Sequence, residues 1–496
     1  MSFTYKTTNL LRYMFHNKIG KTKIITISAI FTISNICCER FLDTTVPNTS
    51  ISSGNVYSND ATAAAVLTGI YTKISSANGS YGLFRLNGLS VFGGLLSDEL
   101  TLYDLNSSNF INFYQNKLNA QNISADYWGG LYNFLFYVNS AIEGLENAPS
   151  LTPPVRQQLM GEAKFLRAFF HFLLVNLYGN ACLSTTSDYQ INTTLSRTEA
   201  STIYEQIVKD LKDAKNLLRV NYVDGSISGT STERVRPNLS TAEALLARVY
   251  LYMNDYADAE LEATNVIHNG LYDIVPLNDV FKKNSSETIW ALQPVGSGTK
   301  ANTIEGRTFI LSGSGPNSSS RPVYCSQFLL NAFEDGDKRK EEWLGNISLS
   351  NDNTTTTYYY PYKYKIGAIN TSTQEYQVIF RLSEMYLIRA EAKAKQEKFT
   401  EAQADLNTIR NRASLPNDNS PNIEILLTNI AHERQVELFA EWGHRWFDLK
   451  RTKAVDEVMG MVTPIKGGTW QSDWQFLPIL ANQLRFDPNL TQTQGY

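Results

Sequence analysis

The sequence predicts a mainly α-helical fold in which tetratricopeptide-like helix pairs form a superhelical frame, with long loops and a few short strands between them. Three observations lead to this prediction. Two segments, 242–267 and 385–410, share the layout of an antiparallel helix pair. Several other segments have apolar residues at helical spacing, and long stretches rich in Gly, Ser, Asn and Tyr separate them.

The repeated helix pair is defined by the spacing of its small and aromatic residues. In the first segment Ala247 lies twelve residues before Ala259, and Tyr256 lies three residues before Ala259. The second segment repeats both spacings with Ala390, Phe399 and Ala402. Small residues let two antiparallel helices approach closely, and the aromatic residue fills the turn between them, which is the tetratricopeptide arrangement.

Further helices are expected where apolar residues recur at helical spacing, at 125–146, 161–178, 201–218 and 423–439, the last continuing into 441–450. Ser201 is the expected N-cap of the third. The segment 161–178 is apolar on nearly every side after Arg167, so it must be buried. Four tryptophans in regular patterns are interpreted as structural: Trp128, Trp290, Trp442 and Trp446.

Three insertions interrupt the helices, at 75–120, 294–322 and 346–376. A Tyr-rich strand is expected at 358–364. Loops longer than about 15 residues are uncommon in compact domains unless they bind something. We therefore expect the insertions to carry the function and the helices to hold them in place.

Aromatic and polar residues of the insertions are the candidate ligand contacts. A flat ring offers an apolar platform to the C–H face of a sugar, while Asn, Asp and Arg recognise its hydroxyls. The candidates, in or just beyond the insertions, are Tyr81, Asp98, Tyr103, Arg321, Tyr324, Trp343 and Tyr359, with Phe84, Asn109, Tyr358 and Tyr362 as further possibilities.

Composition excludes one class of partner. The 496 residues are 43% hydrophobic and 19% charged, which is typical of a folded chain. The net charge of −4 offers no basic footprint for nucleic acid. Of the four cysteines, Cys182 and Cys325 are expected to be buried free thiols, with a disulfide between them as the alternative.

The first 37 residues are expected to be a lipoprotein signal peptide. Three lysines precede the apolar run 24–33, which is too short to span a bilayer but suits the core of a signal peptide. Met14 is an alternative start. We expect cleavage before Cys38 and acylation of its thiol and new amino group, with Cys37 as the alternative site and plain secretion as the alternative outcome.

Three glutamates invite an enzymatic interpretation. Glu433, Glu437 and Glu441 recur every four residues, so they would share one face of a helix. A glycoside hydrolase could use Glu437 and Glu441 as acid and base. We favour a structural network instead, because cationic residues that can neutralise them are plentiful: Arg410, Arg412, Arg434, Arg445 and Arg451.

Other catalytic signatures are missing from the sequence. The five histidines do not form a zinc motif, and neither a phosphate-binding loop nor a Gly-x-Ser-x-Gly elbow occurs. We therefore expect a protein that binds rather than catalyses, without metal or cofactor.

Several motifs in order along the chain resemble the SusD/RagB family of outer-membrane lipoproteins. They are Cys38-x-x-Phe-Leu-Asp, Glu162-Ala-Lys-Phe-Leu-Arg-Ala, Leu177-Tyr-Gly, Arg381-Leu-Ser-Glu-Met-Tyr-Leu-Ile-Arg-Ala-Glu-Ala, Glu433-Arg-x-x-Glu437-x-x-x-Glu441-x-x-x-Arg445-x-x-Asp-Leu-x-Arg451 and the C-terminal Phe476-Leu-Pro-Ile. The family's usual proline after Tyr-Gly is absent, since Asn180-Ala181 follows here, and this departure affects one local turn.

The resemblance implies a single SusD-like domain over 38–496, with an N-terminal part over about 38–225 and a C-terminal RagB/SusD part over about 240–496. It also implies four tetratricopeptide-like pairs, a lipid anchor on the outer face of the outer membrane, and a SusC-like TonB-dependent transporter as partner. The expected ligand is a glycan, with a peptide as the alternative within the family. The weakest alternative is a tetratricopeptide adaptor that binds peptide tails.

Overall fold

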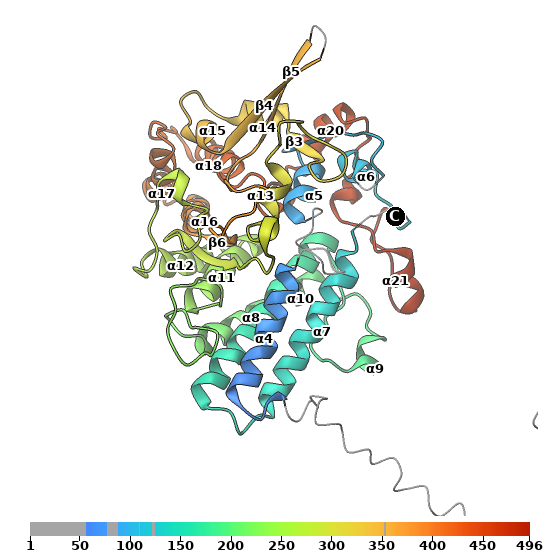
Figure 1. Ribbon diagram of the computed structural model, residues 1–496, viewed down its shortest axis with the longest axis vertical. Helices are drawn as coiled ribbons and strands as arrows, with labels where there is room; N and C mark the ends of the chain where they lie inside the picture. Colours follow the sequence, from blue (N-terminus) through green and yellow to red (C-terminus); the bar gives the residue numbers. More distant parts are fainter. Residues whose placement is uncertain (1–55, 77–87, 109, 122–124, 352–353) are drawn as a thin grey trace, which may run out of the picture. The chain divides into compact units, whose positions relative to one another are not determined.

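The computed structural model (Figure 1) describes residues 56–76, 88–108, 110–121, 125–351 and 354–496. The helices and strands of these residues all lie within the unit Tyr57–Tyr496. The longer helices are α4 (Asp60–Ser75), α7 (Tyr127–Glu146), α8 (Pro153–Tyr178), α10 (Ala200–Leu217), α11 (Leu239–Met253), α12 (Tyr256–Ile267), α16 (Leu382–Lys395), α17 (Phe399–Arg412) and α18 (Ile423–Glu437). The prediction of a mainly helical fold is confirmed.

These helices pack on one another largely in chain order. Each of α7, α8, α10, α11, α12 and α16 packs on the next, α17 and α18 both pack on α16, and α4 packs on α7 and α8. Short links turn α11 into α12 and α16 into α17, which makes the partners of each pair antiparallel. The result is a stacked helical frame, as the repeated spacing predicts.

The two predicted repeat units become the pairs α11–α12 and α16–α17. Ala247 and Ala259 are fully buried, as are their counterparts Ala390 and Ala402. Tyr256 and Phe399 begin the second helix of each pair and pack, partly buried, against the core. Caps explain where the first pair begins and turns, since Asn238 forms a capping box with Thr241 and Asp255 accepts a bond from the Asp258 N–H.

Helix boundaries differ from expectation in three places. Helix α8 begins eight residues before 161, with Pro153 at its first position, where the missing N–H costs nothing. Helix α10 begins at Ala200, so Ser201 lies inside the helix and the prediction that it is the N-cap is wrong. The late helix is broken between α18 and α19 (His444–Arg451), because Ala440, Trp442 and Gly443 have positive φ angles of 53°, 49° and 73°.

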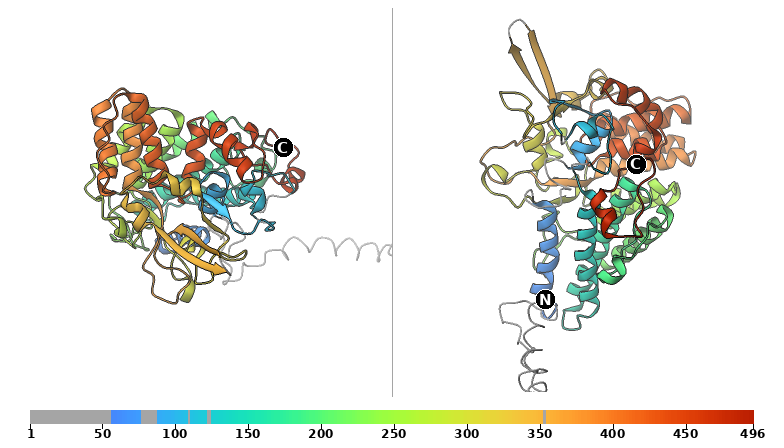
Figure 2. Two further views of the ribbon diagram at one scale, coloured as in Figure 1. Left: turned by 90° about the horizontal axis from the view of Figure 1, so that it is seen from above. Right: turned by 90° about the vertical axis from the view of Figure 1, so that its right-hand side faces the viewer.

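The described residues also form three two-stranded antiparallel sheets: β1 (Leu100–Leu102) with β3 (Val323–Cys325), β2 (Thr288–Leu292) with β6 (Gln377–Arg381), and β4 (Leu344–Asn351) with β5 (Thr354–Pro361). The expected strand at 358–364 is therefore displaced toward the N-terminus, since Pro361 ends the ladder. Figure 2 shows the β4–β5 hairpin from two further sides, extending away from the helices.

The insertions contain more regular structure than their composition suggests. The short helices of the fold are α5 (Leu89–Leu96), α6 (Ile111–Tyr114), α9 (Tyr189–Asn192), α13 (Ile304–Phe309), α14 (Gln327–Ala332), α15 (Lys338–Glu342), α20 (Val455–Ile465) and α21 (Ala481–Phe486), with 3-10 turns η1 (Leu277–Asp279), η2 (Gly298–Lys300) and η3 (Ser472–Gln475). Helix α5 is buried at all eight positions, so the first insertion is anchored in the core.

Cys182 and Cys325 are buried free thiols, as favoured from the sequence. Burial raises the pKa of the Cys182 thiol to about 11 and that of Cys325 well above its usual value, so both stay protonated at neutral pH. Trp128 and Trp290 are core residues, with 4% and 0% exposure. Within the described ranges, the structure contains no helix with the length and apolar character needed to cross a membrane.

Candidate functional site

The small β1–β3 sheet presents one polar and aromatic face to the surface. Leu100 and Leu102 are buried, whereas Thr101 between them is partly exposed, because successive side chains of a strand point to opposite faces. Strand β3 alternates in the same way, and its partly exposed Tyr324 lies directly opposite Thr101. Tyr103 follows β1 with 44% exposure and continues the outward face, its N–H donating to the Pro322 carbonyl at 2.9 Å.

The β4–β5 hairpin brings a third tyrosine to this face. The ring centroid of Tyr358 lies 5.1 Å from that of Tyr324 and 6.0 Å from that of Tyr103, with interplanar angles of 81° and 76°. Edge-to-face contacts of this kind are the favoured arrangement of aromatic pairs. We call Tyr103, Tyr324 and Tyr358 the aromatic cluster. Its members come from the first insertion, from just beyond the second and from the third, which the sequence alone could not bring together.

The Tyr324 hydroxyl remains a donor at neutral pH. Burial, followed by the neighbouring phenols of Tyr114, Tyr358 and Tyr103, raises the pKa of Tyr324. Tyr114 ends the short helix α6 and is the residue beside the cluster that the sequence analysis did not single out. No signal beyond its place in the first insertion could have identified it. Rings held in fixed mutual orientation, with hydroxyl groups at their edges, suit a ligand with alternating apolar and hydroxyl-bearing faces.

Two of the predicted ligand residues are structural instead, which corrects the prediction for Asp98 and Trp343. Asp98 has 4% exposure, and its carboxylate accepts from Arg445 Nε and Nη2 at 2.9 and 2.7 Å. Trp343 has no exposed surface, and its Nε1–H donates to the Leu277 carbonyl at 3.0 Å. Neither side chain is within reach of a ligand at the surface.

The remaining predicted residues have different surroundings. Arg321 is half-buried and donates from Nε to the Ile310 carbonyl at 2.7 Å, so it ties the ends of the preceding loop together. Tyr359 is 37% exposed and stands opposite Asn346, one residue from Tyr358 and therefore on the other face of β5. The structure thus brings together Tyr103 and Tyr324 but not Tyr359. Tyr81, Phe84, Asn109 and Cys38 lie outside the described residues.

The three glutamates form the centre of a buried ion network. Glu433, Glu437 and Glu441 are 0%, 0% and 6% exposed. The cations that pair with them are Arg339 (with Glu433 and Glu437), Arg381 (with Glu437 and Glu441), Arg412 (with Glu437), Arg410 (with Glu433) and Lys363 (with Glu441). The structural interpretation is therefore confirmed.

The prediction of which cations pair with these glutamates is only partly correct. Arg410 and Arg412 do bind the glutamates. The other three expected cations pair elsewhere, Arg434 and Arg451 with Asp448 and Arg445 with Asp98. The break after α18 redirects the chain that carries Arg445 and Arg451, whereas Arg434 lies on α18 directly after Glu433 and therefore points away from the face of the glutamates.

The pKa of Glu437 argues against a role in acid–base chemistry. Burial acts to raise it, but the guanidinium groups of Arg412, Arg381 and Arg339 outweigh burial and hold the pKa far below its usual value. A carboxylate that is enclosed and permanently charged can neither reach a glycosidic bond nor donate a proton to it. Among the described residues, no group of three His, Cys, Asp or Glu side chains is placed to hold a metal ion.

Comparison with known proteins gives consistent results over most of the chain. Residues 340–496 match the family model described as the SusD family, and residues 40–251 match the one described as starch-binding associating with outer membrane. SusD-like protein P38 of Formosa agariphila is 25% identical, over 74% of this chain and 79% of that protein.

Solved structures share the fold. A SusD superfamily protein from Bacteroides vulgatus superposes with a TM-score of 0.75 at 20% identity, covering 88% of this chain and 99% of that one. A laminarin-binding SusD-like protein superposes with a TM-score of 0.72 at 23% identity, covering 88% and 100%. The family models, the curated relative and the shared fold agree, and the chain belongs to the SusD/RagB family.

Proposed function

We propose that this protein is a cell-surface lipoprotein that captures an oligo- or polysaccharide on the aromatic cluster and passes it to a partner SusC-like TonB-dependent transporter without cleaving it. The observation that carries the proposal is the convergence of Tyr103, Tyr324 and Tyr358 on one accessible surface. Partly exposed aromatic rings that gather on one surface indicate a binding site, because exposed apolar patches tend to mark such sites.

Two relationships support a glycan as the ligand. One of the matching family models is described as starch-binding, and a solved structure of the same fold is named for binding laminarin. Both starch and laminarin are neutral sugar polymers, whose C–H faces stack on aromatic rings. A peptide remains the competing ligand, since extended peptides also use aromatic surfaces.

The absence of catalysis is supported by the state of the glutamates. The hydrolase alternative needs Glu437 and Glu441 at a cleft, whereas both are enclosed and paired with cations. Membrane attachment is proposed through acylation of Cys38. The family description of association with the outer membrane supports it, and the sequence of the first 38 residues has the expected form.

Binding is tested by affinity electrophoresis of the wild-type protein through gels that contain neutral glycans, and by titration with labelled peptides. We expect retardation by at least one glycan, no release of reducing ends, and no peptide binding. Peptide binding alone would contradict the glycan proposal, and release of reducing ends by the pure protein would contradict the non-enzymatic one.

Anchoring and partnership need the native cell. We expect palmitate labelling of the wild type and of Cys37→Ala but not of Cys38→Ala, and co-purification of the wild type with a large outer-membrane β-barrel. Labelling that survives Cys38→Ala would show that another residue carries the lipid. Purification without any transporter would contradict the proposed transfer of the glycan to a transporter.

A further inference from the structure

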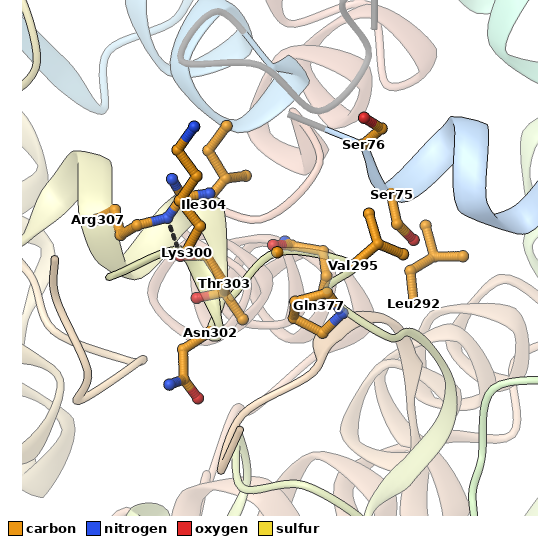
Figure 3. Close-up of a pocket in the computed structure, with 12 residues that line it drawn as sticks. Ser75, Ser76, Leu292, Val295, Lys300, Asn302, Thr303, Ile304, Arg307 and Gln377 are labelled. Atoms are coloured by element: carbon orange, nitrogen blue, oxygen red, sulfur yellow. Dashed lines mark hydrogen bonds between the residues drawn. The ribbon is translucent and has the colours of Figure 1, made fainter. Parts of the chain in front are cut away.

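A small cavity lies apart from the aromatic cluster, where the end of α4 meets the second insertion (Figure 3). Its volume is about 110 Å³. Lys300 and Arg307 line it from the second insertion, Asn302 and Thr303 from the segment between them, and Gln377 from the start of β6. None of the twelve residues that line it is Asp or Glu.

The two cations of this cavity have no carboxylate partner. Within the described part of the chain neither the exposed Lys300 nor the half-buried Arg307 makes an ion pair. Among the described residues the Arg307 side chain donates only from Nε, to the Thr303 carbonyl at 3.4 Å, as the dashed line in Figure 3 shows. Burial lowers the pKa of Arg307, which is the expected consequence of desolvation without a compensating carboxylate.

Several buried arginines elsewhere in the protein are neutralised by carboxylates. Arg339, for example, has no exposed surface and contacts three carboxylates. Arg307 differs from them, because its half-buried guanidinium has no partner for its terminal nitrogens among the described residues, a condition that it shares with Arg321. Such a fork of N–H groups matches the geometry of a carboxylate, sulfate or phosphate group, which would supply the missing charge.

Two amide side chains add a fixed polar wall. Asn302 is 2% exposed and its Oδ1 accepts from the backbone N–H groups of Gln374 and Glu375 at 2.8 and 3.0 Å, so it cannot rearrange freely. Gln377 is 6% exposed, and its buried Oε1 has no hydrogen-bond partner among the described residues. Buried acceptors are nearly always paired, so an unpaired one at a cavity wall calls for a donor such as a sugar hydroxyl.

We infer that this cavity, the basic pocket of Lys300 and Arg307, binds an oxyanion substituent of the captured glycan, a carboxylate or a sulfate or phosphate ester, while the Gln377 Oε1 accepts from a hydroxyl of the same sugar. The inference rests on the proposed function and narrows its ligand to an acidic glycan. A cavity of about 110 Å³ has room for one substituent and not for a polymer. An adjoining cavity of about 390 Å³ shares Ser75, Leu292 and Val295 with it and offers space for the attached sugar ring.

The pocket and the aromatic cluster are linked along the chain. Lys300 and Arg307 precede β3, and α13, which carries Arg307, is followed by Ile310, the residue whose carbonyl holds Arg321. Charge recognition here would select among glycans that the rings alone cannot distinguish, because every sugar has a C–H face.

The test compares three polymers on one gel system: laminarin as the neutral glycan, polygalacturonate as the uronate source and a carrageenan as the sulfate source. Inorganic sulfate serves as the competitor. The double variant Lys300→Gln, Arg307→Gln removes both charges. The control Lys209→Gln, Arg156→Gln removes the same two charges from exposed positions on α10 and α8.

We expect the wild type to bind one acidic polymer at least tenfold more tightly than laminarin, and the basic-pocket variant to lose about tenfold in affinity for it, which corresponds to about 1.4 kcal/mol. The control variant should bind as the wild type does, and excess sulfate should weaken binding of the wild type and of the control variant but not of the basic-pocket variant. Which acidic polymer is preferred identifies the substituent. Loss of laminarin affinity in the basic-pocket variant would overturn the inference, since the pocket would then serve neutral sugar.

Failure of the two proposals can be distinguished. If laminarin binds and neither acidic polymer binds better, the basic pocket is not an anion site while glycan capture stands. If none of the three polymers nor any other glycan binds, the proposed function itself fails. Equal weakening in the basic-pocket and control variants would show a general effect of net charge and would also overturn the inference.

Discussion

Replacement of Glu437 by Gln tests the ion network at its centre. The side chain has no exposed surface and its carboxylate contacts three guanidinium groups, those of Arg339, Arg381 and Arg412. Gln keeps the size of the residue and removes the charge. The three arginines then lose their shared anion, although Arg339 still faces Glu433 and Arg381 still faces Glu441.

The expected cost follows from general values for buried pairs. Removal of one partner of a buried ion pair costs about 3–5 kcal/mol, because it leaves uncompensated charge. Unfolding entropy is about 2.1 cal/mol/K per residue, which over the unit Tyr57–Tyr496, 440 residues long, gives about 0.9 kcal/mol/K. Glu437→Gln should therefore lower Tm by about 3–5 °C, toward the smaller value because all three arginines keep another carboxylate partner, which for Arg412 is Glu287.

Differential scanning calorimetry at pH 7 measures this shift. The matched control is Glu341→Gln in α15, the same change at an ion pair with Lys338 whose side chains are 62% and 48% exposed. Exposed pairs contribute less than about 1 kcal/mol, so its Tm should move by about 1 °C or less. A Glu437→Gln protein that melts with the wild type would refute the reasoning, and a glycan-cleaving activity lost in this variant would support the hydrolase alternative instead.

Two further predictions concern close packing and pH. In Gly93→Ala the new Cβ would lie 2.5 Å from the Gly443 Cα, so α5 must separate from the start of α19 and Tm should fall by several degrees. The control is Gly69→Ala on α4, where no atom lies within 4 Å of the added Cβ. This change should be neutral or should stabilise the fold by up to about 1 kcal/mol. Calorimetry of the two variants measures both effects. Burial, then the neighbouring Asp98, raises the pKa of Glu99 to about 8. The folded state therefore holds a proton that the unfolded chain releases near pH 4.5, so Glu99 reduces stability as pH rises from about 4.5 to about 8, by at most about 1.4 kcal/mol per pH unit. Thermal melts of Glu99→Gln should lose this decline, and an unchanged pH profile would contradict the assignment.

The helical frame was predictable because its rules are local. Two helices can pack closely only with small residues at the contact, so Ala247 and Ala259 mark the same geometry as Ala390 and Ala402. The error at Ser201 arose from the same local reasoning. A serine near a helix start is usually a cap, but here the helix begins at Ala200, and the distant Asn180 Oδ1 accepts from the Ala200 N–H at 3.1 Å.

The binding surface was harder to predict because its contacts span the chain. Asp98 has the polarity of a ligand residue, but its partner Arg445 lies 347 positions away and encloses it. Strands β1 and β3 have three residues each, too few to show an alternating pattern in sequence. Tyr358 and Tyr359 are neighbouring residues of the same type. They lie on opposite faces of β5, and which face each one occupies depends on the register with β4.

Because Tyr358 belongs to the aromatic cluster and Tyr359 does not, a comparison of variants at these two positions tests most directly whether the cluster captures the glycan. Isothermal titration of the best-binding glycan should show Tyr358→Ala weakened at least tenfold, about 1.4 kcal/mol, and Tyr359→Ala unchanged, with equal Tm values for both variants. Equal affinities for the two variants, or a loss confined to Tyr359→Ala, would contradict the account.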